Sequence, residues 1–365
     1  MKTWAVIGGG NGGQTFAAHL AIQGEKVRLF SKSEEKIDII SKSNTITLHH
    51  GIEGTGKLEF ATMDIKRAMH GAENIVVILP STYHEMTARM IIPNLVDGQN
   101  VLLLPEASCG ALAFRHYMKQ MKCSANVVVG AGATLPYATR IIRDGDVYVF
   151  QMKNEVEIAA LPATDNEKLA SAFSIKEPVF KLVHSTLKTS IDNINAMMHG
   201  APSLLNVARI EAIPPQDYEY YREGITPTIC DVLEKMDRER ICIAKSLGFE
   251  QRTLRRQYIE MYSCGDENDS LYELLQKCDA YDGLMAQKTL RTRYILEDIP
   301  YSLVPISALG KIAGVPTPTI DTIINLGKIM IGSDLDDGRT ADHLGISHLT
   351  NTELKALFYG ETNNF

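Results

Sequence analysis

The 365-residue sequence lacks several features that would each indicate a class of protein. It has no basic surplus, because 37 Lys and Arg residues stand against 44 Asp and Glu, a formal net charge of −7. Nucleic-acid binding needs positive charge to neutralise phosphates, so we expect no nucleic-acid partner. No stretch approaches the unbroken apolar run that a bilayer requires, so we expect no membrane partner. The start at Met1 leads into a short apolar strand without the features of a signal peptide.

Closely spaced cysteine pairs are also missing. The six cysteines are Cys109, Cys123, Cys230, Cys242, Cys264 and Cys278, with no C-x-x-C pair and no zinc-type spacing. Scattered cysteines in a chain of this length are typical of reduced, mostly buried thiols. We therefore expect a cytoplasmic protein. The His, Asp and Glu residues also show no typical metal-ligand spacing, so we expect no metal site.

The first half of the chain alternates apolar runs with helical stretches. Hydrophobic residues make up 45% and charged residues 22%, as in ordinary globular proteins, and the length suggests two domains. The runs that suit buried strands are 4–7, 26–30, 75–79, 101–104 and 127–129, with helical spacing over 14–23. This order predicts an N-terminal Rossmann-type, doubly wound α/β domain. Weaker strands at 147–150 and 156–159 would extend its sheet.

The second half has a helical pattern. The helical stretches are roughly 203–212, 227–247, 251–262, 270–276, 283–294, 303–313 and 317–331. They predict an all-α C-terminal domain, with domain ranges of 1–188 and 189–365. We interpret the charged run 234–240 within it as a solvated helix face with i, i+4 pairs.

A glycine-rich loop follows the first strand and opens the first helix. Its sequence G-G-G-N-G-G contains G-x-G-x-x-G as Gly8, Gly10 and Gly13. Gly8 would permit the tight turn, Gly10 the approach of a pyrophosphate, and Gly13 close packing of the helix on the sheet. The helix N-terminus would offer N–H groups to the phosphates, so Asn11 and Gly12 join the expected cofactor contacts. The alternative is a glycine-rich turn without a ligand.

The end of the second strand bears on the choice of dinucleotide. An acidic residue there would bind the ribose hydroxyls of NAD, but this sequence has Ser31 and Lys32, which suit a 2′-phosphate. We therefore favour NADP(H) over NAD(H). In the alternative interpretation Lys32 is a solvated loop residue and Glu34 binds the ribose. Pro80, in a loop that leaves a later strand, is a further expected cofactor contact.

The second half holds the candidate catalytic residues. Asn195 and His199 would share one face of a helix through their i, i+4 spacing, and Asp298 precedes a proline at a sharp helix end. From the residues alone, His199 is more simply a satisfied core histidine, and Asp298 an ordinary helix-end or capping carboxylate. The tyrosines at 218, 220 and 221 are most simply packing or loop-surface residues.

A set of motifs in a particular order spans almost the whole chain. The motifs are G-G-G-N-G-G at 8–13, T-L-P-Y-A-T-R at 134–140, N-x-x-x-H at 195–199, L-N-V-A-R-I-E at 205–211, M-D-R-E-R-I-C-I-A-K-S-L-G at 236–248, R-Y-I-L-E-D-I-P-Y-S-L-V-P at 293–305, G-V-P-T-P-T-I-D at 314–321 and D-G-R-T-A-D-H-L-G at 337–345. In this combination the chain resembles the opine dehydrogenase family, the octopine/nopaline dehydrogenase group. The resemblance implies a dinucleotide domain followed by an all-helical domain.

The resemblance also implies a reaction and its residues. The reaction is the NAD(P)H-dependent reductive condensation of an amino acid with a 2-oxo acid such as pyruvate. A His–Asp pair does the proton chemistry in that family, and His199 and Asp298 stand at the matching positions. Arg293 matches a position associated with substrate-carboxylate binding, and Asn195 lies in the catalytic motif. Gly200 departs from the family, where many relatives have proline after the histidine.

Two alternatives stay open at this point. The layout is also similar to that of ketopantoate reductases and related two-domain enzymes, which reduce a 2-oxo acid without an amine. The alternative that is not an enzyme is a non-catalytic NADP(H)-binding sensor, which would need the glycine loop and no catalytic residues. A helical domain with apolar faces is compatible with a homodimer.

Overall fold

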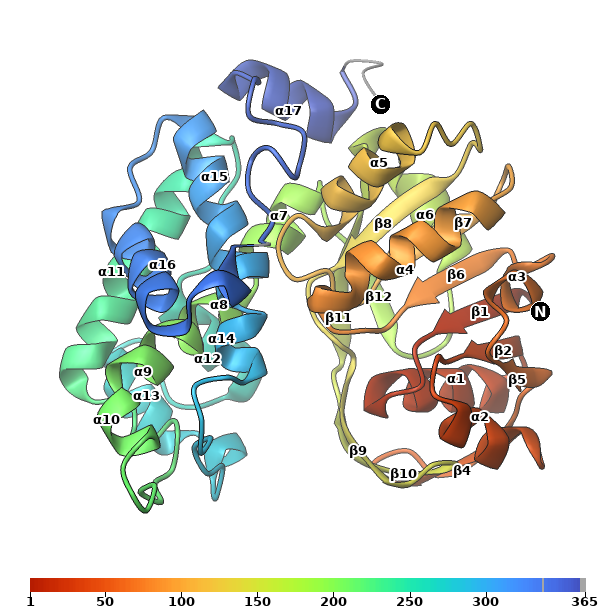
Figure 1. Ribbon diagram of the computed structural model, residues 1–365, viewed down its shortest axis with the longest axis horizontal. Helices are drawn as coiled ribbons and strands as arrows, with labels where there is room; N and C mark the ends of the chain where they lie inside the picture. Colours follow the sequence, from red (N-terminus) through yellow and green to blue (C-terminus); the bar gives the residue numbers. More distant parts are fainter. Residues whose placement is uncertain (337, 362–365) are drawn as a thin grey trace. The chain divides into compact units, whose positions relative to one another are not determined.

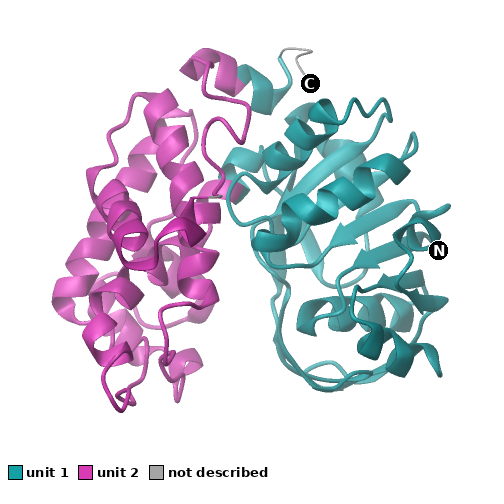
Figure 2. Cartoon of the chain, viewed as in Figure 1, with its two compact units in different colours: residues 1–189, 356–365 teal, residues 190–355 magenta. Residues whose placement is uncertain are grey.

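The chain forms two compact units. The computed structural model describes residues 1–336 and 338–361, so Asp337, the first residue of the motif at 337–345, lies outside the described residues. Met1–Thr189 and the residues from Ala356 on form one unit, and Ser190–Lys355 forms the other (Figure 2). The segment from Ala356 joins the first unit because Tyr359 stacks on His184 and Gly360 packs against Thr164. The division into domains at 1–188 and 189–365 remains a prediction, because compact units are not the same as domains that fold separately.

An eight-stranded sheet forms the centre of the first unit (Figure 1). Its strands are β1 (Thr3–Ile7), β2 (Lys26–Phe30), β5 (Phe60–Thr62), β6 (Asn74–Val77), β7 (Asn100–Leu103), β8 (Val128–Gly132), β11 (Glu155–Leu161) and β12 (Val179–Leu182). The order is β12-β11-β8-β7-β6-β1-β2-β5, and neighbours pair in parallel except β11 and β8. The direction of strand addition reverses beside β1, which is the doubly wound arrangement that the sequence predicted.

Helices accompany this sheet through the first unit. They are α1 (Asn11–Ile22), α2 (Glu34–Ser41), α3 (Ile65–Met69), η1 (Ser81–Tyr83), α4 (His84–Ile91), η2 (Ile92–Asn94), α5 (Gly110–Gln120), η3 (Ala163–Asp165) and α6 (Asn166–Ala172), with α7 (Thr186–Ile191) leading into the second unit. Helices α4 and α5 lie side by side on one face of the sheet (Figure 1). Burial on both faces explains why β1 reads as a continuous apolar run, since Trp4 through Ile7 are fully buried.

A second, four-stranded sheet packs against α1. It consists of β3 (Thr45–His50), β4 (Gly54–Lys57), β9 (Tyr137–Arg143) and β10 (Asp146–Met152), in the order β4-β3-β10-β9. The expectation that 147–150 extends the main sheet is therefore wrong, because β10 pairs with β9 and β3 instead. Val147 and Val149 are fully buried on its inner face. The expected strand at 156–159 does extend the main sheet, as part of β11.

The described residues of the second unit form helices and no sheet. The helices are α8 (Ile194–Met198), α9 (Gly200–Leu205), α10 (Val207–Ile210), α11 (Pro227–Ser246), α12 (Leu254–Tyr262), α13 (Leu271–Lys277), η4 (Asp279–Tyr281), α14 (Arg293–Leu296), η5 (Ile299–Leu303, a π-helix), α15 (Val304–Ala313), α16 (Pro318–Ile331) and η6 (Ser333–Leu335), and α17 (Asn351–Tyr359) returns to the first unit. Together with the α/β unit they confirm the predicted fold class. None of the helices described combines the length and apolar character needed to cross a membrane.

One expected helix is absent from the described second unit. The segment 283–292 is irregular, so the helix predicted over 283–294 is wrong except at its end. Its backbone pairs with a distant segment, since the amide of Tyr220 donates to Leu284 and that of Ala286 donates to Tyr218. These long-range hydrogen bonds replace the i to i−4 bonds of a helix.

The charged run on α11 is partly buried. Arg240 is 1% exposed and donates to Asp237 Oδ1 from Nε at 2.9 Å and from Nη2 at 2.6 Å. It also donates to the carbonyl of Ile191, while Asp237 Oδ2 accepts from the amide of Leu254 at 2.9 Å. The interpretation of this run as a wholly solvated face was wrong. The buried pair therefore connects α11 to Ile191, near the start of the second unit, and to Leu254, the first residue of α12.

Replacing Asp237 by alanine is expected to destabilise the protein strongly. Arg240 would keep its charge without its carboxylate partner, which typically costs about 3–5 kcal/mol when one member of a buried pair is removed. Urea unfolding followed by circular dichroism measures the change. Arg256→Ala, on α12, is the control, because it removes the exposed pairs with Glu260 and Glu267 and should leave the unfolding midpoint nearly unchanged. Equal midpoints for both variants would contradict the assignment.

Candidate active site

The glycine loop between β1 and α1 can exist only with glycine at two positions. Gly8 has φ +136°, and a Cβ there would lie 2.1 Å from the carbonyl oxygen of Ile78. A Cβ on Gly13 would lie 1.7 Å from the carbonyl oxygen of Gly8. No atom lies within 4 Å of a Cβ built on Gly10, so the backbone is open to a ligand there. The amides of the first helical turn have no partner within the helix, so this turn can bind phosphate.

The other loop residues are held by their neighbours. Asn11 Oδ1 accepts from the amide of Ile141 at 3.0 Å, which ties the loop to β9. A Cβ on Gly12 would lie 2.8 Å from the side chain of Leu135. The Asn11 side chain is thus engaged with β9, and Gly12 has no side chain. In both residues the backbone amide is therefore the group that can bind a phosphate. Their contact with a cofactor stays a prediction.

The other predicted cofactor residues follow strands at the same edge of the sheet. Ser31 comes directly after β2, is buried, and lies against Gly9. Lys32 is exposed, with Met86 Sδ 3.5 Å from its Nζ. Pro80 follows β6 and caps η1. Because β1, β2 and β6 are parallel neighbours, their carboxyl ends lie at one edge, where ligands bind in this architecture.

His199 and Asp298 meet in the second unit. His199 ends α8 and begins α9, and Asp298 lies between α14 and the π-helix η5. The distance from His199 Nδ1 to Asp298 Oδ2 is 2.7 Å, and each residue is 8% exposed. An ionised carboxylate only accepts, so Nδ1–H donates and Nε2 is left as the basic nitrogen. Both side chains come from breaks between helices, and π-helical segments are frequent at functional sites.

Burial sets the electrostatics of this pair. Desolvation raises the pKa of the Asp298 carboxyl above its usual value, and the neighbouring His199 partly opposes the shift. A desolvated carboxylate forms a strong hydrogen bond to an imidazole N–H. This interaction fixes the tautomer of His199 and would stabilise an imidazolium during turnover.

Three tyrosines surround the imidazole of His199. The Tyr221 hydroxyl lies 2.9 Å from Nε2, and the Tyr294 ring stacks on the imidazole with centroids 3.9 Å apart. The Tyr220 hydroxyl donates to the carbonyl of His199 at 2.7 Å. The packing interpretation of 218–221 therefore missed the contact of Tyr221 with the candidate base. No spacing signal links residue 221 to 199, so only the tertiary structure could identify it.

The two predicted substrate-binding residues contact the His–Asp pair through their backbones, since the carbonyl of Arg293 accepts from the amide of Asp298 and that of Asn195 from the amide of His199. The Arg293 side chain is 72% exposed, and its Nε donates to Glu297 Oε2 at 2.6 Å. Asn195 is exposed on α8, and its carbonyl accepts from the amide of His199 at 3.1 Å. Both side chains are accessible to a ligand. Their roles stay a prediction.

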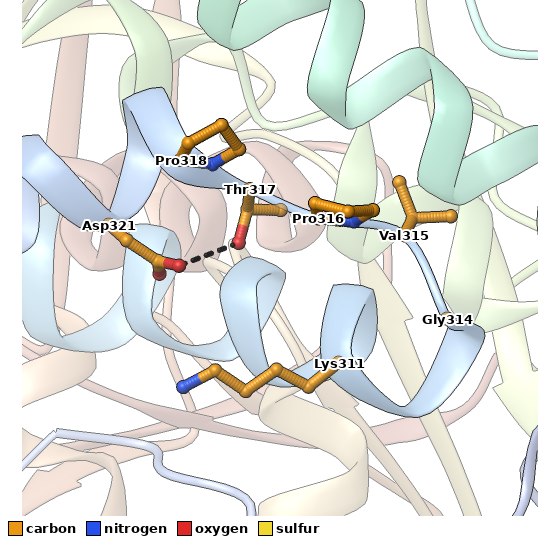
Figure 3. A pocket seen from close by; sticks show the side chains of 7 residues that line it. All are labelled: Lys311, Gly314, Val315, Pro316, Thr317, Pro318 and Asp321. Carbon is orange, nitrogen blue, oxygen red and sulfur yellow. Dashed lines mark hydrogen bonds between the residues drawn. The ribbon is translucent and has the colours of Figure 1, made fainter.

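The motif at 314–321 forms the turn between α15 and α16. It lines a pocket of about 370 Å³ together with Lys311, and Figure 3 shows the hydroxyl of Thr317 pointing toward Asp321. Thr317 Oγ1 donates to Asp321 Oδ2 at 3.2 Å, and Ser307 donates to Oδ1 at 2.6 Å. None of the predicted site residues lines this pocket. The motif at 314–321 therefore stabilises the turn between α15 and α16 and contributes no residue to the candidate active site.

Sequence comparison identifies the family. The chain is 36% identical to an opine dehydrogenase of Arthrobacter sp. (strain 1C), over 96% of each chain. The chain belongs to the opine dehydrogenase family. The sequence-family model described as NAD/NADP octopine/nopaline dehydrogenase, alpha-helical domain, matches residues 182–331. The model described as NAD-dependent glycerol-3-phosphate dehydrogenase N-terminus matches residues 3–105. As a member of this family, the protein is an NAD(P)-dependent oxidoreductase that acts on CH–NH bonds.

Solved structures show the same fold. Octopine dehydrogenase with NADH and L-arginine covers 100% of both chains with a TM-score of 0.82 at 22% identity. Yersinopine dehydrogenase with NADP⁺ bound has a TM-score of 0.71 at 12% identity, over 99% of this chain and 98% of its own. These likenesses agree with a dinucleotide-binding unit followed by a helical unit.

Substituting Asp298 by asparagine is expected to change how stability depends on pH. A carboxyl whose pKa is raised by folding stabilises the protein below its unfolded-state pKa, and that contribution is lost as pH rises through the folded-state pKa. Asparagine does not titrate. The Tm of the wild type minus that of the variant should therefore fall as the pH rises above the ordinary carboxyl pKa of about 4, which calorimetry over a pH series measures.

Asp269→Asn is the matched control for this titration. Hydrogen bonding to Lys277 lowers the pKa of Asp269, so its Tm difference should rise with pH. A Tm difference for Asp298→Asn that stays flat, or that rises with pH, would contradict the buried-carboxylate assignment.

Proposed function

We propose that this opine dehydrogenase joins an amino acid to a 2-oxo acid of the pyruvate type, with His199 as general acid/base and Asp298 as its orienting partner. The observation that carries the proposal is the buried 2.7 Å hydrogen bond between His199 Nδ1 and Asp298 Oδ2. This bond leaves Nε2 as a base of fixed orientation. The family membership supports the reaction class.

The first unit fits a nicotinamide dinucleotide. A Cβ at Gly8 or Gly13 would collide with a backbone carbonyl, so only glycine allows the tight loop. The space beside Gly10 is open, and the first turn of α1 presents its amides there. The bound NAD(P)H would supply the hydride that reduces the imine. The chain's own contribution is to orient the two substrates and to move protons.

His199 would serve the proton steps of the condensation. The amine must be neutral to attack the keto carbon, so a base must take its proton. The carbinolamine then loses water, and the proton held on Nε2 can be returned to the leaving hydroxyl. Asp298 would stabilise the imidazolium between these steps, because its carboxylate accepts from Nδ1–H throughout. Help of this kind is typically worth roughly 10²- to 10⁴-fold in rate.

Arg293 and Asn195 would bind substrate carboxylates. Glu297 accepts from Nε of Arg293, so the remaining N–H groups of the exposed guanidinium can form two parallel bonds to a carboxylate. Asn195 precedes His199 by one helical turn and would place an amide beside the same ligand. These assignments extend the acid/base proposal from the chemistry of the residues.

The proposal includes NADP(H) as the preferred cofactor. Lys32 follows β2 and is exposed, so its charge can reach a 2′-phosphate, and Ser31 beside it carries a hydroxyl. The complex of yersinopine dehydrogenase with NADP⁺ supports the use of this cofactor within the fold. A cytoplasmic location and a homodimer remain further predictions from the sequence.

A spectrophotometric assay tests the reaction. Purified protein with NADPH, pyruvate and pooled amino acids should oxidise the cofactor only when both substrates are present. Oxidation without the amine would indicate a simple 2-oxo acid reductase of the ketopantoate type. Cofactor binding without any oxidation, over a panel of 2-oxo acids, would indicate a non-catalytic sensor.

His199→Ala is expected to lower kcat by roughly 10²- to 10⁴-fold, since the variant lacks the acid/base group. The affinity for NADPH, measured by calorimetry, should be unchanged because the glycine loop belongs to the other unit. His348→Ala is a control at an exposed histidine. Near wild-type turnover of His199→Ala would remove this residue from the mechanism.

Lys32→Ala should weaken the use of NADPH and leave the use of NADH unaffected. The loss of one charge-assisted contact of about 1.5–3 kcal/mol predicts a KM for NADPH raised roughly tenfold or more. The KM for NADH should stay within about twofold, because NADH has no 2′-phosphate for Lys32 to contact. Lys42→Ala, at an exposed lysine that ends α2, is the matched control. Equal effects on both cofactors would contradict the NADP(H) assignment.

A further inference from the structure

The basic nitrogen of His199 is covered by a tyrosine. Asp298 occupies Nδ1, and the hydroxyl of Tyr221 lies 2.9 Å from Nε2. Since neutral Nε2 only accepts, the Tyr221 hydroxyl donates to it. A substrate can therefore exchange a proton with His199 in this arrangement only through Tyr221 or after Tyr221 has moved away.

The packing of Tyr221 opposes its displacement. Its ring stacks on Tyr281 with centroids 3.8 Å apart and planes 8° apart, and it meets Tyr220 edge-on at 5.0 Å. Tyr281 is anchored in turn, because its hydroxyl donates to the fully buried Tyr258 at 2.8 Å. Moving Tyr221 would break this stack. The geometry therefore favours proton transfer through the hydroxyl over movement of the side chain.

A second tyrosine covers one face of the imidazole. The ring of Tyr294 stacks on His199 with centroids 3.9 Å apart and meets Tyr220 edge-on at 5.0 Å. Tyr294 is partly buried, whereas Tyr221 is 7% exposed. The imidazole is thus held between Asp298, Tyr221 and Tyr294, and the Tyr221 hydroxyl is the group at Nε2.

We propose that Tyr221 relays protons between Nε2 of His199 and the substrate. Tyr221 passes its hydroxyl proton to Nε2 and takes one from the substrate amine. The hydroxyl loses one proton and gains one, so the net result is one proton moved to His199. The reverse sequence delivers that proton to the leaving hydroxyl. The relay rests on the proposed role of His199 and makes Tyr221 a catalytic residue, because its hydroxyl meets the substrate.

Burial suits Tyr221 to a neutral relay. Desolvation raises the pKa of Tyr221 well above the ordinary value, so the side chain stays a neutral phenol. A neutral hydroxyl both donates and accepts, which a phenolate does not. The titratable and charged groups around the imidazole and its carboxylate partner are Asp298, Tyr220, Tyr221, Tyr294, Arg293 and Glu297.

Tyr221→Phe tests the relay, because it keeps the stacked ring and removes only the hydroxyl. With NADPH, pyruvate and pooled amino acids, kcat should fall about 100-fold, at the lower end of the range for acid–base catalysis, and KM values should change less than about threefold. The dependence of kcat/KM on pH should change, because Nε2 of His199 loses the hydrogen bond from Tyr221. The solvent deuterium effect on kcat should also change.

Tyr218→Phe is the matched control. Tyr218 is 1% exposed, and among the described residues its hydroxyl has no hydrogen-bond partner, so its removal should leave kcat within about twofold and the pH profile unchanged. Nitrogen NMR of substrate-free protein adds a readout that is independent of turnover. The Nε2 resonance of His199, assigned by comparison with His199→Ala, should move in Tyr221→Phe and not in Tyr218→Phe.

Tyr221→Leu provides a second variant should Tyr221→Phe fold poorly. Leucine also lacks the hydroxyl, so a similar fall in kcat is expected. The relay is overturned if both variants match Tyr218→Phe in kcat, pH profile and isotope effect while His199→Ala is inactive. Turnover by His199→Ala itself would overturn the acid/base assignment together with the relay, which distinguishes the two failures.

Discussion

The hydrogen bond between His199 and Asp298 is the interaction on which the proposed chemistry of this protein depends. It joins two breaks in the helical unit, one between α8 and α9 and one between α14 and the π-helix η5. Ending a helix at each of these residues turns a polar side chain toward the other. Desolvation raises the pKa of the Asp298 carboxyl, so its charge is maintained by the imidazole that it orients.

The aromatic residues around this pair provide a dry and rigid environment. Tyr294 covers one face of the imidazole, and Tyr221 rests on Tyr281, which hydrogen-bonds to Tyr258. Hydrogen bonds strengthen in such a medium, and an unsatisfied polar atom is costly there. The hydroxyl at Nε2 therefore both satisfies the imidazole in the resting protein and provides a route for its proton.

The α/β unit solves a different physical problem. Its loop must bring backbone amides close to a phosphate, which requires that no side chain intervene. Gly10 leaves the backbone open for this approach, while Gly8 and Gly13 let the loop close tightly, since a Cβ at either of these two positions would overlap a backbone carbonyl. The predicted dinucleotide site thus depends on the absence of side chains, whereas the candidate site of the helical unit depends on side chains held in place by packing.

The sequence alone determined the features that depend on local order. The alternation of apolar runs predicted the doubly wound sheet, and the glycine spacing predicted the tight loop, because both are properties of neighbouring residues. The resemblance to a family pointed to His199 and Asp298. Long-range contacts decided the rest, namely the second sheet beside α1, the irregular segment after Tyr281, and the buried pair of Asp237 and Arg240. Tyr221 belongs to this second group, because its contact with His199 joins residues 22 positions apart through tertiary packing that no periodicity encodes.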